Sequence, residues 1–291
     1  MPSSFLIRRT LTQLSLASCF AFACSGVQAA GFRLPEQSIA GLGLSNALVA
    51  NPDLPGALPY NPAVMAFQEG LHFSAGLLAV DPNLRVTNAT GNPSSDVDSP
   101  IVIPNLNLMG HLNTSWSWGL SVIAPFGLET RWADESFPGF AGTLDPLEPA
   151  YSKVEMVNVN PNIAYRFNES TSVALGVDYY RVNKAVLDTQ SIKMRGDGAD
   201  WGWNIGLLHK AGPWSFGAAY RSSVEVGIEG GLSATALGST ASIAKTKVKF
   251  PEIWQVGARY QATEQLAVEA DIERTGWSSF DTPASRTPAP A

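Results

Sequence analysis

Residues 214–228 read WSFGAAYRSSVEVGI, a run in which apolar and polar side chains alternate. Successive side chains of a β-strand point to opposite faces, so a period of two predicts a strand with one apolar face and one polar face. The apolar parity of this run consists of Trp214, Phe216, Ala218, Tyr220, Ser222, Val224, Val226 and Ile228. We therefore expect an all-β protein built from strands of this kind.

The same alternation recurs along the chain. We expect strands at 71–80, 101–112, 116–125, 151–167, 172–187, 201–210, 214–229, 243–260 and 264–277. The connections between them alternate between long and short, which is typical of outer-membrane barrels, with short turns at one end and long loops at the other. Several of these strands are also longer than those of soluble sheets. The pattern favours a transmembrane antiparallel β-barrel over a soluble sandwich, which shows the same alternation.

Tryptophan placement agrees with this prediction. Six of the eight tryptophans fall near ends of expected strands, namely Trp116, Trp118, Trp201, Trp203, Trp214 and Trp277. An amphipathic ring suits the headgroup level of a membrane. Beyond the first thirty residues no run of 18 apolar residues exists, so membrane-spanning helices are not expected there.

The first thirty residues have the features of a secretory signal peptide. Arg8 and Arg9 form a basic region, 11–27 an apolar region, and Val27-Gln28-Ala29 a small-residue cleavage site. Both cysteines, Cys19 and Cys24, fall inside it, so we expect an exported chain without disulfides. An alternative is a lipoprotein signal in which Cys19 is acylated.

Residues 31–65 keep neither helical nor strand period, although they are too apolar for a solvated linker. They contain several glycines and prolines and end near Asn61-Pro62-Ala63. We expect residues 31–70 to form a plug, or hatch, inside a barrel built by 71–280. The last stretch, 281–291, is a proline-rich, low-complexity tail that cannot form a ladder strand. With nine expected strands, an odd number, we interpret the chain as a fragment produced by truncation or frameshift.

Several motifs follow one another along the chain. They are Gly31-Phe32-Arg33-Leu34, Gly41-Leu42-Gly43, Asn61-Pro62-Ala63-Val64-Met65, Trp201-Gly202-Trp203-Asn204-Ile205-Gly206, Tyr220-Arg221-Ser222, Pro251-Glu252-Ile253-Trp254 and Trp277-Ser278-Ser279-Phe280. Taken in this order, they resemble the FadL-type family of outer-membrane transporters, which includes TodX-like channels. The resemblance implies a fourteen-stranded barrel with an N-terminal hatch, of which about nine strands are present. It also implies passive, hatch-gated transport of long-chain fatty acids or other hydrophobic compounds across the Gram-negative outer membrane, without a cofactor.

The resemblance implies that Gly31, Phe32 and Arg33 move and open the passage. We assign Asn61, Pro62, Ala63 and Met65 to the hatch, where Asn61-Pro62-Ala63 either forms a tight turn that ends it or contacts the ligand directly. The route that the resemblance implies runs from the outer loops to a pocket near the hatch and leaves through a gap in the barrel wall. Loop 188–200 is short where fatty-acid transporters have a longer one, which leaves other hydrophobic ligands open.

Charged residues on the expected strands suggest a network in the lumen, consisting of Arg221, Glu225, Lys245, Lys247, Lys249, Glu269, Asp271 and Glu273. The lysine row can steer carboxylates, as inward charges do in porins. Alternatively, the lysines face the acidic row 269–273 on the next strand and balance its charge.

Other functions receive little support from the sequence. The net charge of −6 argues against nucleic-acid binding, which needs a basic surface. His72, His111 and His209 have no metal-ligand spacing, and no nucleophile motif appears, so we expect no metal and no catalytic residue. Expected partners are a hydrophobic ligand, outer-membrane lipid, lipopolysaccharide and the barrel-assembly machinery, with the protein a monomer. Two alternatives stay open: an adhesive surface barrel binding through loops 82–100 and 126–150, and a barrel enzyme acting on lipids.

Overall fold

A computed structural model describes residues 31–89, 91–97, 100–140, 142–234 and 239–277. The chain divides into two compact units, 1–31 and 32–291, and all the described helices and strands lie in the second. The expected signal at 1–30 and tail at 281–291 lie outside the described residues, so those two expectations stay predictions.

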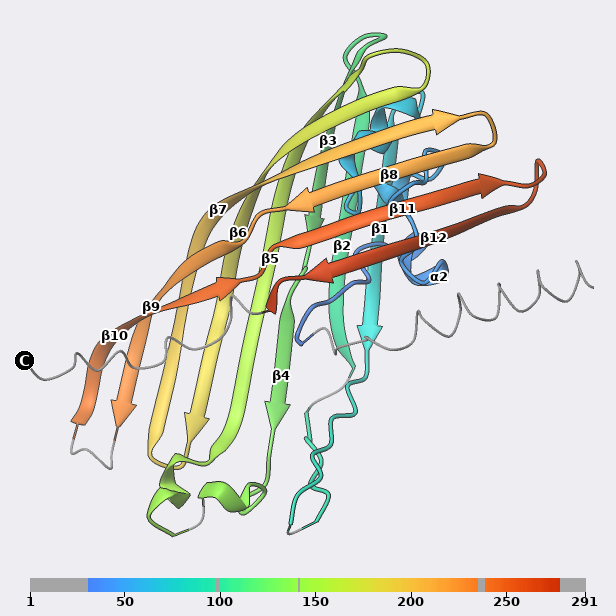
Figure 1. Ribbon diagram of the computed structural model, residues 1–291. Helices are drawn as coiled ribbons and strands as arrows, with labels where there is room; N and C mark the ends of the chain where they lie inside the picture. The colour runs from blue at the N-terminus through green and yellow to red at the C-terminus, as the bar shows by residue number, and fades with distance from the viewer. Residues whose placement is uncertain (1–30, 90, 98–99, 141, 235–238, 278–291) are drawn as a thin grey trace, which may run out of the picture. The chain divides into compact units, whose positions relative to one another are not determined.

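The second unit contains one antiparallel sheet (Figure 1). Its described strands are β1 His72–Val80, β2 Ile101–His111, β3 Trp116–Ile123, β4 Gly127–Arg131, β5 Pro149–Arg166, β6 Thr171–Thr189, β7 Ile192–Ala211, β8 Trp214–Arg221, β9 Val224–Ala234, β10 Ser239–Phe250, β11 Ile253–Gln261 and β12 Ala267–Thr275. The main order is β1-β2-β3-β5-β6-β7-β8-β11-β12, with β4 on β5, and β9 between β7 and β10. Among the described residues, β1 and β12 end the main path, and β4 and β10 each pair on one side only.

The helical elements are short. The segment before β1 contains α2 Ile39–Gly43, η1 Pro55–Ala57 and η2 Pro62–Phe67. The connection from β4 to β5 contains η3 Pro138–Phe140 and η4 Gly142–Leu147. No helix among the described residues is both long and apolar enough to cross a membrane.

The expected set of nine uninterrupted strands is wrong in two respects: 214–229 and 243–260 are each broken in two, and a further strand, β4, follows the expected strand 116–125. β3 and β4 both pair with β5, and β8 and β9 both pair with β7. The break between β10 and β11 lies at Pro251-Glu252, opposite the break between β8 and β9 at Ser222-Ser223. The described sheet therefore has nine wall positions, three of which consist of two strand segments.

The expected loop 188–200 is also wrong. β6 extends to Thr189 and β7 begins at Ile192, so most of these residues belong to a long hairpin. Lys193 pairs with Asp188, and Gly198 with Val182, across a ladder that contains one bulge. Alternation continues through 192–201, which is why the hairpin can extend beyond the expected turn.

The outer face of β7, β8 and β11 is apolar and exposed. Its large side chains are Trp201, Trp203, Ile205, Leu207, Trp214, Phe216, Trp254, Val256 and Tyr260. Their rings form two belts, one containing Trp203, Tyr220 and Trp254, the other Trp214 and Tyr260. Six residues separate the belts along β8, or about 20 Å at the rise of a β-strand. Two aromatic belts flanking an apolar band are typical of barrel walls in lipid.

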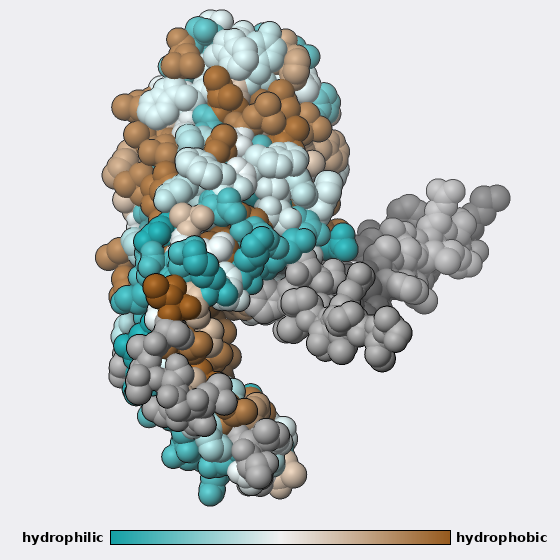
Figure 2. Space-filling model, turned by 90° about the vertical axis from the view of Figure 1, so that its left-hand side faces the viewer, coloured by the Kyte–Doolittle hydropathy of each residue, from teal (hydrophilic) through white to brown (hydrophobic). Residues whose placement is uncertain are grey.

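The wall exchanges its faces at the paired breaks. Arg221 and Val224 are both buried although they lie three positions apart, and the register against β7 shifts by one residue between Asn204↔Arg221 and Asp197↔Glu229. One residue of the break is therefore a bulge that reverses the alternation. Beyond the break, β9 and β10 place valines and isoleucine inward and charged residues outward. Figure 2 shows hydrophilic side chains gathered below the hydrophobic part of this face. The outer surface thus changes from apolar to polar toward the long-loop end.

Candidate functional site

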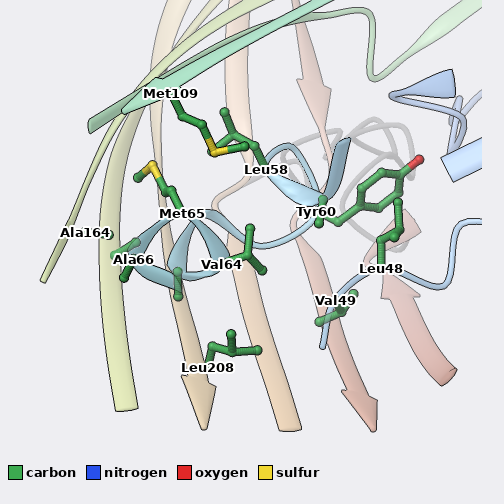
Figure 3. Packing of buried hydrophobic residues seen from close by; sticks show 13 residues of the cluster. Leu48, Val49, Leu58, Tyr60, Val64, Met65, Ala66, Met109, Ala164 and Leu208 are labelled. Carbon is green, nitrogen blue, oxygen red and sulfur yellow. The ribbon is translucent and has the colours of Figure 1, made fainter. Parts of the chain in front are cut away.

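The hatch, defined here as residues 32–70, packs against the inner face of the sheet. Its 3-10 helices contact β1, β2, β3, β5, β6 and β7. The buried cluster between hatch and wall consists of Leu48, Val49, Ala57, Leu58, Tyr60, Ala63, Val64, Met65, Ala66, Met109, Ala164, Ala174 and Leu208. Figure 3 shows Leu58 and Met65 directed toward the strands that carry Met109 and Ala164. Met65, which the sequence assigned to the hatch, is therefore one of its core residues.

Wall glycines allow this close approach. A Cβ atom at Gly76, Gly119, Gly206 or Gly217 would meet the hatch atoms of Ile39, Met65, Asn61 and Val49 respectively. These glycines lie on β1, β3, β7 and β8. Because glycine has no side chain, the hatch backbone can lie directly on the strands.

The Asn61-Pro62-Ala63 motif fixes the hatch to the wall. Asn61 is fully buried, and its Nδ2 donates to the carbonyls of Val49 at 2.7 Å and of Leu207 on β7 at 3.0 Å. Its Oδ1 accepts from the Ala63 N–H at 3.1 Å, so Asn61 caps η2, and Pro62 occupies the first position of that helix. Ser172 Oγ on β6 donates to the Ala63 carbonyl at 2.8 Å. These contacts give the motif a structural role in the hatch.

Tyr60 is the central polar side chain of the hatch. Its hydroxyl accepts from the Gln37 N–H at 3.0 Å and lies 3.0 Å from the Pro35 carbonyl and 2.9 Å from Asn46 Oδ1. Burial raises the pKa of Tyr60 to about 12. The neutral phenol is therefore the form that links Tyr60 to Pro35, Gln37 and Asn46 within the hatch.

The acidic row of β12 binds the hatch backbone. Asp271 Oδ2 accepts from the N–H groups of Leu48 and Val49, each at 2.8 Å, and Glu269 Oε1 accepts from that of Ala50 at 2.8 Å. Arg259 of β11 forms an ion pair with hatch Asp53 at 2.8 Å. The acidic row of β12 therefore forms hydrogen bonds with the hatch and not with the lysine row.

The prediction that the lysine row faces this acidic row is wrong. In the antiparallel register of β11 and β12, the partners of Glu269, Asp271 and Glu273 are Arg259, Gly257 and Gln255. The lysines lie on β10, which pairs with β9 instead. Lys245 contacts Glu229 at 2.5 Å, Lys247 contacts Glu225 at 2.6 Å, and Lys249 lies opposite Glu225 in the ladder. These pairs are exposed on the outer face, so the lysines and the acidic row belong to two separate groups rather than to one network.

Arg221 belongs to a third, buried polar group that sequence reasoning found only in part. Its guanidinium forms an ion pair with Asp178 of β6 and lies 3.4 Å from the hatch carbonyl of Pro59. Asn204 Nδ2 donates to Asp178 Oδ2 at 2.9 Å, and Arg221 Nη1 lies 3.4 Å from Asn158 Oδ1. Asn158, Asn160 and Asn162 of β5 alternate with apolar residues in the sequence, which indicates that they share the polar, inner face of the strand. No local pattern distinguishes Asp178.

The wall has a gap beside the break between β3 and β4. β2 pairs with β3 only from Leu106 to His111, and its remaining residues pair with β1 alone. β4 pairs only with β5. A cavity of about 680 Å³ lies here, lined by β1, β2, β3 and β5 and including Pro104, Ile123 and Met156.

The N-terminal residues of the hatch lie at this break. The Leu34 N–H donates to the Pro125 carbonyl at 2.9 Å, and the Gly127 N–H donates to the Phe32 carbonyl at 3.0 Å. Arg33 forms the bridge with Phe126 and an ion pair with Glu273 at 3.2 Å. Phe32 and Arg33 thus link β12 with the break. Gly31 has a positive φ of 58° and belongs to the first unit.

An apolar cluster continues inward from the gap. Its buried members are Phe126, Met156, Tyr180, Val182, Val224, Val226, Ile228, Phe250 and Ile253, with Phe32, Val154, Ala185, Val248 and Trp277 packed against them. The Phe32 ring lies 4.8 Å from that of Trp277 and 6.0 Å from that of Phe126, centroid to centroid. A second cavity of about 280 Å³, lined by Val154, Ala185, Ile228 and Val248 among others, adjoins this cluster toward the long-loop end.

The donor sets for other chemistry are missing from the described part of the chain. There, no group of three or more His, Cys, Asp or Glu side chains is arranged to hold a metal ion. His111 and His209 contact Ser117 and Thr171, each at 2.9 Å, on separate strands.

An antiparallel wall with an apolar outer band, aromatic belts and an internal hatch defines an outer-membrane β-barrel transporter. Residues 20–289 match the family model described as outer membrane protein transport protein (OMPP1/FadL/TodX), and the chain belongs to this family. The family transports hydrophobic compounds across the Gram-negative outer membrane and is not enzymatic, so the chain is not an enzyme.

Relatives and solved structures agree with this assignment. The chain is 25% identical to a long-chain fatty acid transport protein of Salmonella typhi and 27% identical to a 47 kDa outer membrane protein of Pasteurella multocida. Each comparison covers 92% of this chain and 71% of the relative.

A FadL homologue of Pseudomonas aeruginosa has the same fold, with a TM-score of 0.67, 18% identity, and 86% of this chain and 71% of that chain covered. The Ralstonia pickettii toluene transporter TbuX also has this fold, with a TM-score of 0.63 and 22% identity. That comparison covers 81% of this chain and 72% of TbuX.

Proposed function

We propose that the protein allows hydrophobic small molecules, long-chain fatty acids or other apolar compounds, to pass the outer membrane passively, under control of the hatch. One observation carries this proposal. The wall gap between β2 and β4 lies beside a break at which Phe32 and Leu34 are bound to 125–127. A segment held by few backbone hydrogen bonds can leave without unfolding the wall.

The proposed route follows the apolar surfaces. The ligand enters the 280 Å³ cavity, which shares Ile228 and Val248 with the apolar cluster. It continues past Phe32 to Met156, which belongs both to the cluster and to the 680 Å³ cavity at the gap. Displacement of the N-terminal residues, here Gly31, Phe32 and Arg33, then opens lateral exit into the membrane.

The remaining assignments accompany this function. We propose residues 31–70 as the hatch and 71–280 as the wall, with Asn61, Pro62 and Ala63 holding the hatch against β6 and β7. Fatty acids are a candidate ligand class because a relative from Salmonella typhi is named for them, and aromatic compounds because TbuX is named for toluene. Outer-membrane lipid and lipopolysaccharide would surround the wall of a monomer inserted by the assembly machinery.

Uptake into liposomes tests the proposal. Phe32→Ala removes the ring that lies against Phe126, Phe250 and Trp277, so the segment is released more often and oleate uptake rises severalfold. Phe73→Ala, an exposed residue on the outer face of β1, serves as the matched control. Wild-type vesicles that take up neither oleate nor toluene faster than empty vesicles would exclude transport and favour an adhesive role for the long loops.

A further inference from the structure

The ion pair between Arg33 and Glu273 connects the N-terminal segment to β12. Arg33 Nε and Nη2 donate to the two carboxylate oxygens of Glu273, each at 3.2 Å. Arg33 Nη1 donates to the carbonyls of Leu34 at 2.7 Å and Pro125 at 3.2 Å. The Arg33 side chain is 1% exposed and that of Glu273 is 26% exposed. The guanidinium is therefore buried, and the carboxylate that neutralises it lies within reach of other molecules.

The two partners differ in what they lose on separation. Glu273 also accepts from Gln255 Nε2 at 2.9 Å and from Thr275 Oγ1 at 3.1 Å, so it keeps hydrogen bonds when Arg33 moves away. Arg33 would keep its contacts to the carbonyls of Leu34 and Pro125 and to the side-chain amide of Gln37, none of which carries a charge. An uncompensated buried charge is strongly unfavourable. Separation from Glu273 is therefore less costly when another anion takes its place.

Arg33 lies where an amphipathic molecule can supply that anion. Its guanidinium carbon is 5.9 Å from the centre of the Phe126 ring, and its neighbour Phe32 packs in the apolar cluster. A ligand whose chain occupies the cluster can bring its polar head to Arg33. Arginine and a carboxylate form two parallel hydrogen bonds, so a ligand carboxylate fits the geometry that Glu273 now occupies.

We propose that Arg33 and Glu273 form a carboxylate-exchange latch. The carboxylate of an amphipathic ligand replaces Glu273 at Arg33, which frees residues 32–34 from β12 and opens the gap. Neutral compounds of equal length lack the replacing anion and open it much less often. This inference rests on the proposed function and assigns the discrimination between carboxylates and neutral compounds to one ion pair.

Oleate and oleyl alcohol, which share a chain and differ in the head group, test the latch. Uptake of each is measured in liposomes containing the wild type, Arg33→Gln, Glu273→Gln or Lys247→Gln. The last variant removes a lysine on the outer face and serves as the control. Heat-modifiable gel mobility establishes that each variant is folded. Glu273→Gln retains size and carries the test if Arg33→Gln fails to insert.

The wild type should take up oleate at least about tenfold faster than the alcohol, the effect of one charge-assisted hydrogen bond. In Arg33→Gln the ratio of oleate to oleyl alcohol uptake should fall to about one. Glu273→Gln should speed uptake of the alcohol and so lower the ratio. Lys247→Gln should leave the ratio as in the wild type. A ratio of one in the wild type, or an unchanged ratio in Arg33→Gln, overturns the latch and leaves transport standing. A wild type that takes up neither probe overturns the proposed function, and the latch with it.

Discussion

Gly206 of β7 lies directly under Asn61, and a Cβ atom there would collide with Asn61 Oδ1. We expect Gly206→Ala to displace the hatch and destabilise the protein by roughly 1–3 kcal/mol, the usual cost of overpacking. Gly227→Ala, where a Cβ atom meets nothing within 4 Å, is the matched control. Unfolding in urea, followed by gel mobility, measures both. Equal midpoints for the two variants would show that the hatch does not lie against β7.

Tyr60 predicts how the hatch responds to alkali. Because its folded pKa is raised to about 12, the unfolded chain ionises first, and the stability that its burial contributes is complete below pH 10 and lost as pH rises to about 12. Over this pH range the free energy of unfolding falls by roughly 3 kcal/mol. In Tyr60→Phe this part of the pH dependence disappears. Protease cleavage of the hatch between pH 9 and 12 measures it, and identical profiles for wild type and variant would contradict the assignment.

At the scale of the element, the break between β8 and β9 explains why alternation predicted one long strand. The bulge exchanges the faces at the position where the outer surface changes from apolar to polar. The inner surface changes there in the opposite sense, from the polar groups that hold the hatch to the apolar cluster. Trp214 and Val226 therefore share a parity in the sequence while they lie on opposite faces. A single sequence shows the period but not the environment of each face.

The lipid-facing band makes a prediction of its own. Leu207 on the outer face of β7 lies between the belts, so Leu207→Arg should destabilise the wall by roughly 2–4 kcal/mol. Asn183→Arg, exposed on β6 beyond the belt of Trp203 and Tyr220, should change stability little. Unfolding in lipid vesicles compares them. If both variants were equally stable, the outer face of β7 would not lie in lipid.

At the scale of the whole molecule, the sequence predicted the class and the hatch better than the site. The lack of a helical or strand period in 31–65 indicated a plug. Asn61, in the motif that ends this segment, binds the carbonyls of Val49 in the hatch and of Leu207 in the wall. The buried pair of Arg221 with Asp178 and the hatch contacts of Asp271 depend on which strands become neighbours. The register that brings Glu273 to Arg33 joins residues 240 positions apart, which local patterns do not encode.

A reversible disulfide between the N-terminal segment and the strand break tests whether the ligand passes through the gap. Arg33 and Phe126 are bridge partners flanked by backbone hydrogen bonds, an arrangement whose Cα atoms lie about 4.5 Å apart, within the range of a disulfide. In Arg33→Cys/Phe126→Cys, oxidation should reduce oleate uptake at least about tenfold and dithiothreitol should restore it, while neither single variant responds. If the fully cross-linked protein took up oleate as fast as the reduced protein, the ligand would not pass through the gap beside β3 and β4.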